Sequence, residues 1–216
     1  MNLERLEEEL ALMTRDSTLE DYYTDWLNDA VLEIASDFEL PDLKLKEPAS
    51  LSTTESDWLY DLPATFHKKV FKCRNSNGDL ITVGRRIQTI EEIDYDHDET
   101  DDYVTTIAVE AGQIAIFPMA EDTLSLWYYR LPVAMSEKTD EPDGIPAAYH
   151  ERVIIPKIII KNSAILQDLT IQYPPDYFHT KYSNGLYGSP AGDVGMINYF
   201  AKSKGSKKHG GRDPLP

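Results

Sequence analysis

The chain has 216 residues, of which 41% are hydrophobic and 27% charged, and this composition predicts a folded domain rather than a disordered chain. Its formal net charge of −17 opposes binding to a nucleic-acid phosphate backbone, because such binding depends on lysine and arginine. The single cysteine, Cys73, excludes an internal disulfide and any zinc site built from several thiolates, and it fits a reducing compartment.

The N-terminal segment is acidic and lacks the basic start, apolar stretch and cleavage site of a secretory signal peptide. The longest apolar stretch, residues 153–160, is interrupted by Pro156 and Lys157. It is far shorter than the roughly 20 residues that cross a bilayer. We therefore expect a soluble protein with no membrane partner.

Two amphipathic helices are predicted near the N-terminus. Apolar residues recur at helical spacing over residues 3–13, and again from Tyr23 to Phe38 within a helix that we expect over residues 18–39. Ser17 and Glu20 have the spacing of a capping box at the start of that second helix.

A small antiparallel sheet is predicted over residues 69–131. Residues 69–86 have the pattern of a hairpin, because Asn77-Gly78 supplies the positive φ angle that tight turns need. Further strands are expected at residues 103–109, 113–117 and 123–131.

A bent helix is predicted over residues 147–169, since Pro156 lacks the N–H that a helix interior uses. Residues 173–216 are rich in Gly, Pro and aromatic residues and are expected to form an extended arm that orders on binding a partner. The predicted fold is α+β: a mainly α-helical core (a helical bundle) over residues 1–172, with a small β insertion, followed by that arm.

A run of carboxylates between residues 91 and 102 predicts an acidic loop. Its D-x-D-x-D start is the first half of a calcium loop, but Glu99 stands where an EF-hand needs Gly and Thr105 where it needs Glu. We therefore expect a mobile, solvated loop with no metal. If the protein forms a channel, the loop could face the lumen and repel a passing polyanion. The residues concerned are Asp94, Asp96, Asp98, Glu99, Asp101 and Asp102.

No catalytic motif is recognisable. The histidines do not have metal-ligand spacing, the phosphate-loop and nucleophile-elbow patterns are absent, and Cys73 falls inside a predicted strand, where it is expected to be a small buried hydrophobe. The sequence predicts no enzyme and no cofactor. The aromatic run from Trp127 to Arg130 is either a base-stacking platform or, as we favour, a strand with alternating faces.

The end of the chain combines aromatic anchors with cationic residues. Aromatic side chains give a large contact area at low entropic cost, and lysines suit an acidic partner surface. The candidate docking residues are Tyr199, Phe200, Lys202, Lys204, Lys207, Lys208 and Arg212.

Four short motifs follow one another along the chain: Trp26-Leu27-Asn28-Asp29-Ala30, residues 112–118, residues 126–132 (Leu-Trp-Tyr-Tyr-Arg-Leu-Pro) and residues 145–150 (Ile-Pro-Ala-Ala-Tyr-His). In this order they resemble the pattern of head-to-tail connector (adaptor, or head-completion) proteins of tailed bacteriophages. The resemblance covers about residues 18–168. Two features depart from the pattern: Pro156 inside the last helix, and the long aromatic tail.

The resemblance implies a ring of twelve subunits beneath the capsid portal, made in the host cytoplasm and located at the head–tail junction of the virion. Such a ring would join the portal protein to the tail tube or nozzle protein and leave a channel through which DNA passes without specific binding. In similar adaptors the C-terminal arm reaches the portal, and the corresponding segment here would be residues 199–212.

Two other functions remain open from the residues alone. One is a monomeric ligand-binding or regulatory module with the β insertion as its site. The other is a small hydrolase that uses Cys73 or a carboxylate pair, for which Cys73→Ala would abolish activity.

Overall fold

The structure is a computed structural model that describes residues 1–84, 86–94, 96–166, 173–174 and 176–205. The chain divides into two compact units. The helical unit comprises Met1–Asp37 and Pro132–Pro216, and the sheet unit comprises Phe38–Leu131. Within the described ranges, no helix combines the length and the apolar character needed to cross a membrane.

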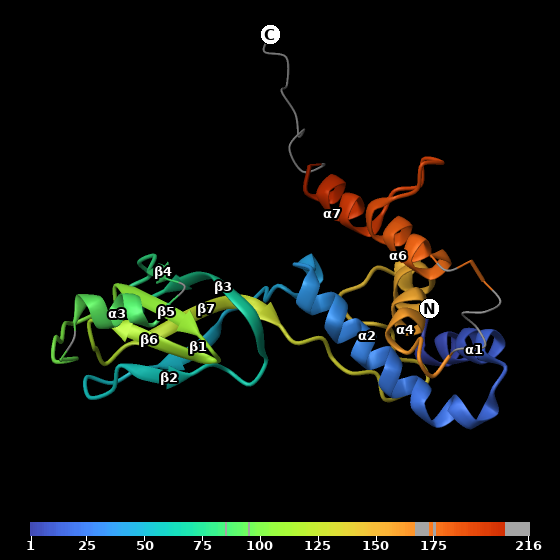
Figure 1. Ribbon diagram of the computed structural model, residues 1–216. Helices are drawn as coiled ribbons and strands as arrows, with labels where there is room; N and C mark the ends of the chain where they lie inside the picture. Colours follow the sequence, from blue (N-terminus) through green and yellow to red (C-terminus); the bar gives the residue numbers. More distant parts are fainter. Residues whose placement is uncertain (85, 95, 167–172, 175, 206–216) are drawn as a thin grey trace, which may run out of the picture. The chain divides into compact units, whose positions relative to one another are not determined.

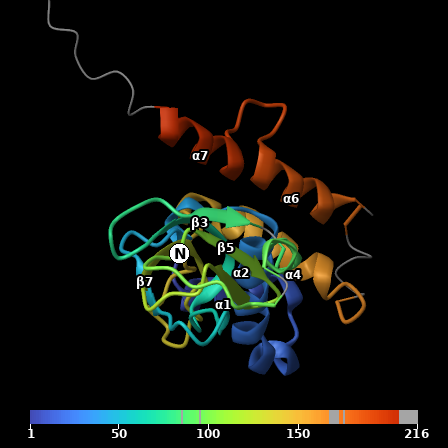
Figure 2. The same ribbon diagram turned by 90° about the vertical axis from the view of Figure 1, so that its left-hand side faces the viewer.

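The helical unit contains the N-terminal and C-terminal helices of the chain (Figures 1 and 2). Its buried side chains include Leu6, Leu10, Leu27 and Ile34, which are fully inaccessible and belong to the apolar stripes of the first two helices. The α-helices are α1 (Leu3–Thr14), α2 (Tyr23–Asp37), α4 (Ile155–Lys161), α6 (Tyr177–Tyr187) and α7 (Met196–Gly205).

Helix α2 begins at Tyr23, later than the sequence suggested, because residues 17–22 form a tighter 3-10 helix. Asp16, rather than Ser17, caps this segment: its Oδ1 accepts hydrogen bonds from the backbone N–H of Thr18 at 3.0 Å and from the Thr18 hydroxyl at 2.7 Å. A carboxylate at this position satisfies otherwise unpaired backbone donors.

Helix α4 is short and begins at Ile155, so that Pro156 lies in its first turn, where its missing N–H costs nothing. The residues before it wind irregularly, with a 3-10 turn at Ala147–Tyr149 and a wider π turn at His150–Ile154. The helix ends at Lys161, and residues 167–169 of the predicted helix lie outside the described residues.

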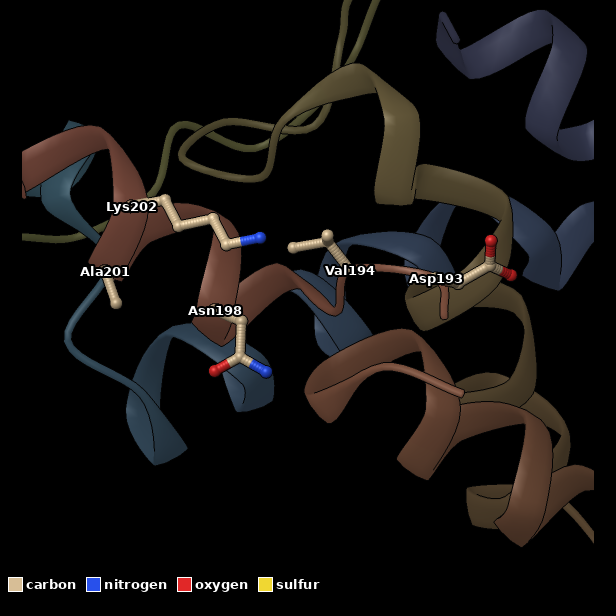
Figure 3. A pocket seen from close by; sticks show the side chains of 5 residues that line it. All are labelled: Asp193, Val194, Asn198, Ala201 and Lys202. Carbon is tan, nitrogen blue, oxygen red and sulfur yellow. The ribbon is translucent and has the colours of Figure 1, made fainter. Parts of the chain in front are cut away.

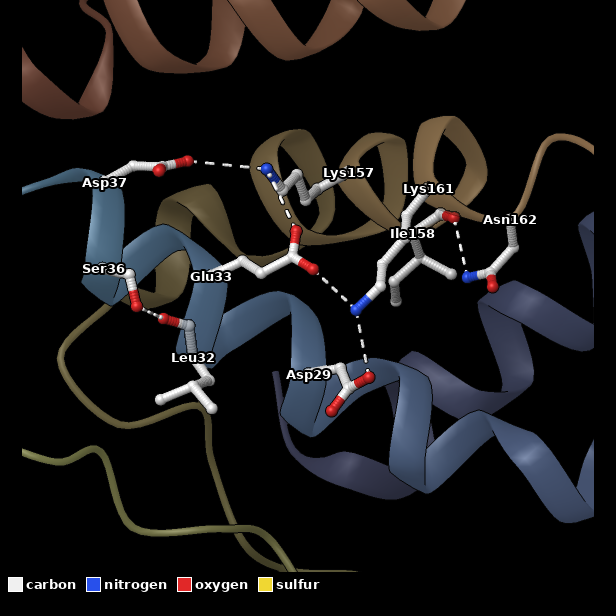
Figure 4. Close-up of polar contacts among 9 residues, drawn as sticks. All are labelled: Asp29, Leu32, Glu33, Ser36, Asp37, Lys157, Ile158, Lys161 and Asn162. Carbon is white, nitrogen blue, oxygen red and sulfur yellow. Dashed lines mark hydrogen bonds and ion pairs between the residues drawn. The ribbon is translucent and has the colours of Figure 1, made fainter.

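An ion-pair network joins α2 to α4 (Figure 4). The Nζ of Lys161 lies 2.6 Å from Glu33 Oε1 and 3.0 Å from Asp29 Oδ2. Lys157 Nζ lies 3.2 Å from Glu33 Oε2 and 3.5 Å from Asp37 Oδ2. The pKa of Glu33 is lowered, chiefly by its hydrogen bond with Lys161.

The sheet unit contains two sheets. The first has strand order β1-β7-β3, antiparallel throughout, and the second has order β2-β6-β5-β4, in which β4 pairs with β5 in parallel. The strands are β1 (Ala49–Ser52), β2 (Leu59–Asp61), β3 (Phe66–Arg74), β4 (Thr82–Gly84), β5 (Thr106–Glu110), β6 (Gln113–Phe117) and β7 (Thr123–Arg130).

The two sheets share one hydrophobic core. Leu126 and Tyr128 of β7 contribute to it from the first sheet, and Ile107 of β5 and Ile116 of β6 contribute from the second. The opposite face of the second sheet is covered by helix α3 (Gln88–Ile93), which packs Ile90 against Ala108 and Ala115. The unit is therefore layered in the order first sheet, second sheet, helix α3.

The predicted hairpin over residues 69–86 is only partly formed. The turn is present: Gly78 has φ +88°, and its N–H donates to the Asn75 carbonyl oxygen at 3.0 Å. After a single bridge between Arg74 and Leu80, however, the chain leaves β3 and adds β4 to the other sheet. The segment thus links the two layers.

The predicted mainly helical bundle with an extended C-terminal arm is wrong. The protein is a mixed α and β structure in which two sheets have a core of their own, because the strands pair over residues that are far apart in sequence. Residues 177–187 and 196–205 are helical and not extended.

Candidate assembly surfaces

The motif residues near residue 130 support the sheet unit from inside. The hydroxyl of Tyr128, whose ring is fully buried in the core, lies 2.6 Å from Thr65 Oγ1. The hydroxyl of Tyr129 donates to Glu39 Oε2 at 2.8 Å. Burial, followed by the neighbouring Glu39, raises the pKa of Tyr129, so its hydroxyl stays protonated and donates.

The motif residues near residue 150 tie both ends of the helical unit together. The hydroxyl of Tyr149 donates to the Val194 carbonyl oxygen at 3.0 Å, and its ring packs on Tyr199 with centroids 5.7 Å apart. The Nε2 of His150 lies 2.6 Å from the Ile145 carbonyl oxygen, and Nδ1 lies 3.0 Å from the amino group of Met1. These residues are therefore structural, and partner surfaces must be sought outside the motifs.

The acidic loop contacts the sheet unit at several points. Asp94 is buried, and its Oδ2 accepts from the Glu99 N–H at 3.1 Å. Thr100 forms a parallel bridge with Met119, and the His97 ring stacks on Trp58 with centroids 3.8 Å apart. The remaining candidate carboxylates are exposed: Asp96, Asp98, Glu99, Asp101 and Asp102.

The outer face of the first sheet brings lysines onto aromatic rings, an arrangement that is not predicted from the sequence. Lys72 Nζ lies 4.0 Å from the Trp127 ring centroid, and Lys44 Nζ lies 4.8 Å from that of Phe71. Only Arg130 is basic beside the aromatic run in sequence, so no local pattern revealed the lysines. Their positions follow from pairing between β3 and β7 and from the bridge of Lys44 to Tyr129.

The C-terminal candidate residues are only partly described. Phe200 is buried, Tyr199 is half exposed, and Lys202 lines a shallow pocket between the 188–195 loop and α7 (Figure 3). The side chain of Lys204 and the whole of Lys207, Lys208 and Arg212 lie outside the described residues. Two of the proposed aromatic anchors thus belong to a packed helix.

The single thiol has no neighbours that would activate it. Cys73 is fully buried in the core of the sheet unit. Burial, followed by the charge of Asp122, raises its pKa to about 12, which keeps it protonated at neutral pH. Among the described residues, no group of three or more His, Cys, Asp or Glu side chains is arranged to hold a metal ion.

A comparison with known families shows which family the chain belongs to. The family model described as SU10 adaptor protein matches residues 1–155. The chain belongs to the SU10 adaptor protein family. The match spans the entire sheet unit, α1, α2 and the Tyr149-His150 segment, and it confirms the resemblance to phage head-to-tail adaptors. No curated protein matches the chain.

Membership of the SU10 adaptor family indicates a structural role as a virion component that contacts other phage head or tail proteins. The match stops at the start of α4, so α6 and α7 lie outside it.

Proposed function

We propose that this adaptor forms a ring that joins the capsid portal to the tail tube or nozzle and leaves an axial channel for DNA. The match to the SU10 adaptor family carries the proposal. Twelve copies are expected by analogy with adaptors that this sequence resembles. The net charge of −17 supports passage of DNA without specific binding.

The C-terminal segment is proposed to reach the portal. Helices α6 and α7 are joined by residues 188–195, and Tyr199 anchors α7 on Tyr149. This packing supports a role for α7 as the base of a basic segment, residues 202–216, in which Lys202, Lys204, Lys207, Lys208 and Arg212 bind an acidic surface of the portal.

Cryo-electron microscopy of virions and portal-containing capsids tests the ring. Density for this chain directly below the portal, in a closed ring with an open centre, is the expected result. Absence of the chain from the particle would overturn the proposal and favour the monomeric ligand-binding module.

A truncation tests the arm separately. Deletion of Lys202–Pro216 removes only the end of α7 and the residues after it, so the subunit should remain folded while binding to portal-containing capsids falls. A full-length variant separates the effect of charge from that of length. It carries glutamine in place of Lys202, Lys204, Lys207, Lys208 and Arg212. Unchanged capsid binding by both variants would show that the arm has no part in docking.

A further inference from the structure

The outer face of the first sheet carries two lysines, Lys44 and Lys72, that form no direct ion pair among the described residues. The pKa of nearby Glu39 is lowered chiefly by its hydrogen bond with Lys69, and the charge of Lys44 also contributes. The Nζ atoms of Lys44 and Lys72 lie over the rings of Phe71, Tyr129 and Trp127 at 4.8, 5.2 and 4.0 Å from the centroids. Cation–π contacts of this kind hold a lysine over a ring without neutralising it. We call the two lysines and the three aromatic residues the lysine–aromatic face.

Several other lysines of the protein are paired with carboxylates. Lys157 and Lys161 are paired with carboxylates of α2, and Lys69 lies 2.6 Å from Glu39. In contrast, neither Lys44 nor Lys72 forms an ion pair within the part of the chain that the structure describes. Phe71 is 36% exposed and Trp127 is half buried, so the face also offers apolar area. A face with two lysines outside direct ion pairs, in a chain of net charge −17, is suited to an acidic partner.

The acidic loop lies on the other side of the same unit. It follows α3, which covers the face of the second sheet that points away from the first sheet. The stacking of His97 on Trp58 and the bridge from Thr100 to Met119 fix the loop there. The two sheets of the unit and their shared core therefore separate the loop from the lysine–aromatic face. The loop thus cannot bind the face of its own chain.

We propose that the lysine–aromatic face of one copy binds the exposed carboxylates of the acidic loop of a second copy. Two complementary patches on opposite sides of one unit make a head-to-tail contact, and repetition of such a contact gives a ring when the rotation closes. The contact rests on the proposed ring and names its lateral surfaces. It assigns the loop to a neighbouring subunit instead of to the channel lumen.

Exchange of charge between the two patches tests the contact. The face variant Lys44→Glu/Lys72→Glu and the loop variant Asp96→Lys/Asp98→Lys/Asp102→Lys are each purified and added to adaptor-free, portal-containing capsids. Like charges then meet at every contact, so the number of ring-bearing capsids should fall by about tenfold or more for each variant alone.

The two variants together should restore assembly. In an equimolar mixture, the negative face of one variant meets the positive loop of the other, and the positive face of the second meets the negative loop of the first. A single chain that carries all five substitutions should also assemble. Rescue by mixing is not expected from loss of folding or of portal binding, because neither defect is corrected by a second defective chain.

Matched controls carry the same charge changes elsewhere. Arg86→Glu/Lys181→Glu reverses two cations, and Glu20→Lys/Asp21→Lys/Asp25→Lys reverses three exposed carboxylates of the helical unit. These variants should assemble like the parent. A disulfide formed between a Lys72→Cys chain and an Asp98→Cys chain on the capsid would report the contact directly, because buried Cys73 does not compete.

The outcomes separate this inference from the proposed function. If each charge variant forms as many rings on capsids as the parent chain does, the proposed lateral contact is overturned. The proposed ring itself is then unaffected. Normal rings with slowed DNA ejection in the loop variant would show a lumen-facing loop instead. Binding of duplex DNA by the parent that Lys44→Glu/Lys72→Glu abolishes, without loss of rings, would assign the face to DNA. Capsids without any ring of the parent would overturn the proposed function itself.

Discussion

The side-chain amide of Asn28 holds the backbone of Met135 with two hydrogen bonds: Nδ2 donates to the carbonyl oxygen at 3.0 Å, and Oδ1 accepts from the N–H at 2.8 Å. Met135 is 3% exposed, so water does not replace these partners freely. Asn28 belongs to the Trp-Leu-Asn motif of α2, and Met135 lies where the chain has returned to the helical unit. The motif asparagine thus fixes the irregular segment that follows β7 on α2.

Substitution of Asn28 should therefore be costly. Asn28→Leu leaves two buried backbone groups without partners and should lower the free energy of unfolding by about 2–4 kcal/mol. Asn28→Asp retains the hydrogen-bond acceptor, so its free energy of unfolding should lie between those of the parent chain and Asn28→Leu. Urea denaturation measures the effect, with Asp25→Ala on an exposed position of the same helix as the control. An Asn28→Leu chain as stable as the control would contradict this role.

A glycine in α6 should resist substitution although alanine favours helices. A Cβ atom at Gly185 would lie 2.5 Å from the Arg152 carbonyl oxygen and 3.0 Å from Val153 Cγ2. Gly185→Ala should therefore push α6 away from residues 150–154 and cost about 1–3 kcal/mol. Exposed Ser183→Ala in the same helix is the matched control. Thermal unfolding and protease sensitivity of residues 177–205 report the result, and a stabilised Gly185→Ala chain would show that the close approach does not exist.

The network between α2 and α4 should make stability depend on acid and salt. The pKa of Glu33 is lowered, so its contribution is complete above about pH 4.5 and is lost as the pH falls through the lower folded value. The Glu33 and Lys161 side chains are 38% and 37% exposed, so the loss should remain below about 1 kcal/mol and shrink in high salt. Glu33→Gln should flatten the acid limb of the stability curve, and exposed Glu20→Gln should leave it unchanged.

Local patterns in the sequence were sufficient for some elements and not for others. The apolar repeat of α2 specifies a helix because every buried position, from Leu27 to Ile34, falls on one stripe. The strand character of β7 was similarly readable from its alternation. Pairing was not, because β7 joins β1 and β3 from distant parts of the chain. Strands β1 and β2 lie in a polar stretch with few fully buried side chains and gave no signal.

The C-terminal helices were missed for a physical reason that concerns glycine. Gly185 and the glycines around residue 190 lower helix propensity and suggested an arm. In the structure, Gly185 instead permits close packing of α6 on residues 152–153, and tertiary contact outweighs the local preference. The lysine–aromatic face was missed because Lys44, Lys72 and Trp127 meet only after the sheet has formed. The acidic loop was recognisable from composition, but its anchoring was not.

Because of His150, the free energy of unfolding should fall in mildly acidic solution. Its ring is 1% exposed; burial, together with the nearby N-terminal ammonium charge, lowers its pKa despite a hydrogen bond with Ile145. The unfolded chain then binds a proton near pH 6.5 that the folded chain does not. Stability should be constant above about pH 6.5 and fall below it, by about 1.4 kcal/mol for each unit by which the pKa is lowered.

Two histidine variants separate this effect from general acid sensitivity. His150→Gln should remove the decline in stability just below pH 6.5, although it also destabilises the chain by disturbing the bonds to Ile145 and Met1. His179→Gln replaces an exposed ring and should preserve the decline. NMR titration of the His150 imidazole protons gives the pKa of this ring in the folded protein independently. A His150 resonance that titrates at or above the ordinary value in the folded protein would show that this ring is not held neutral between the N-terminus and Ile145.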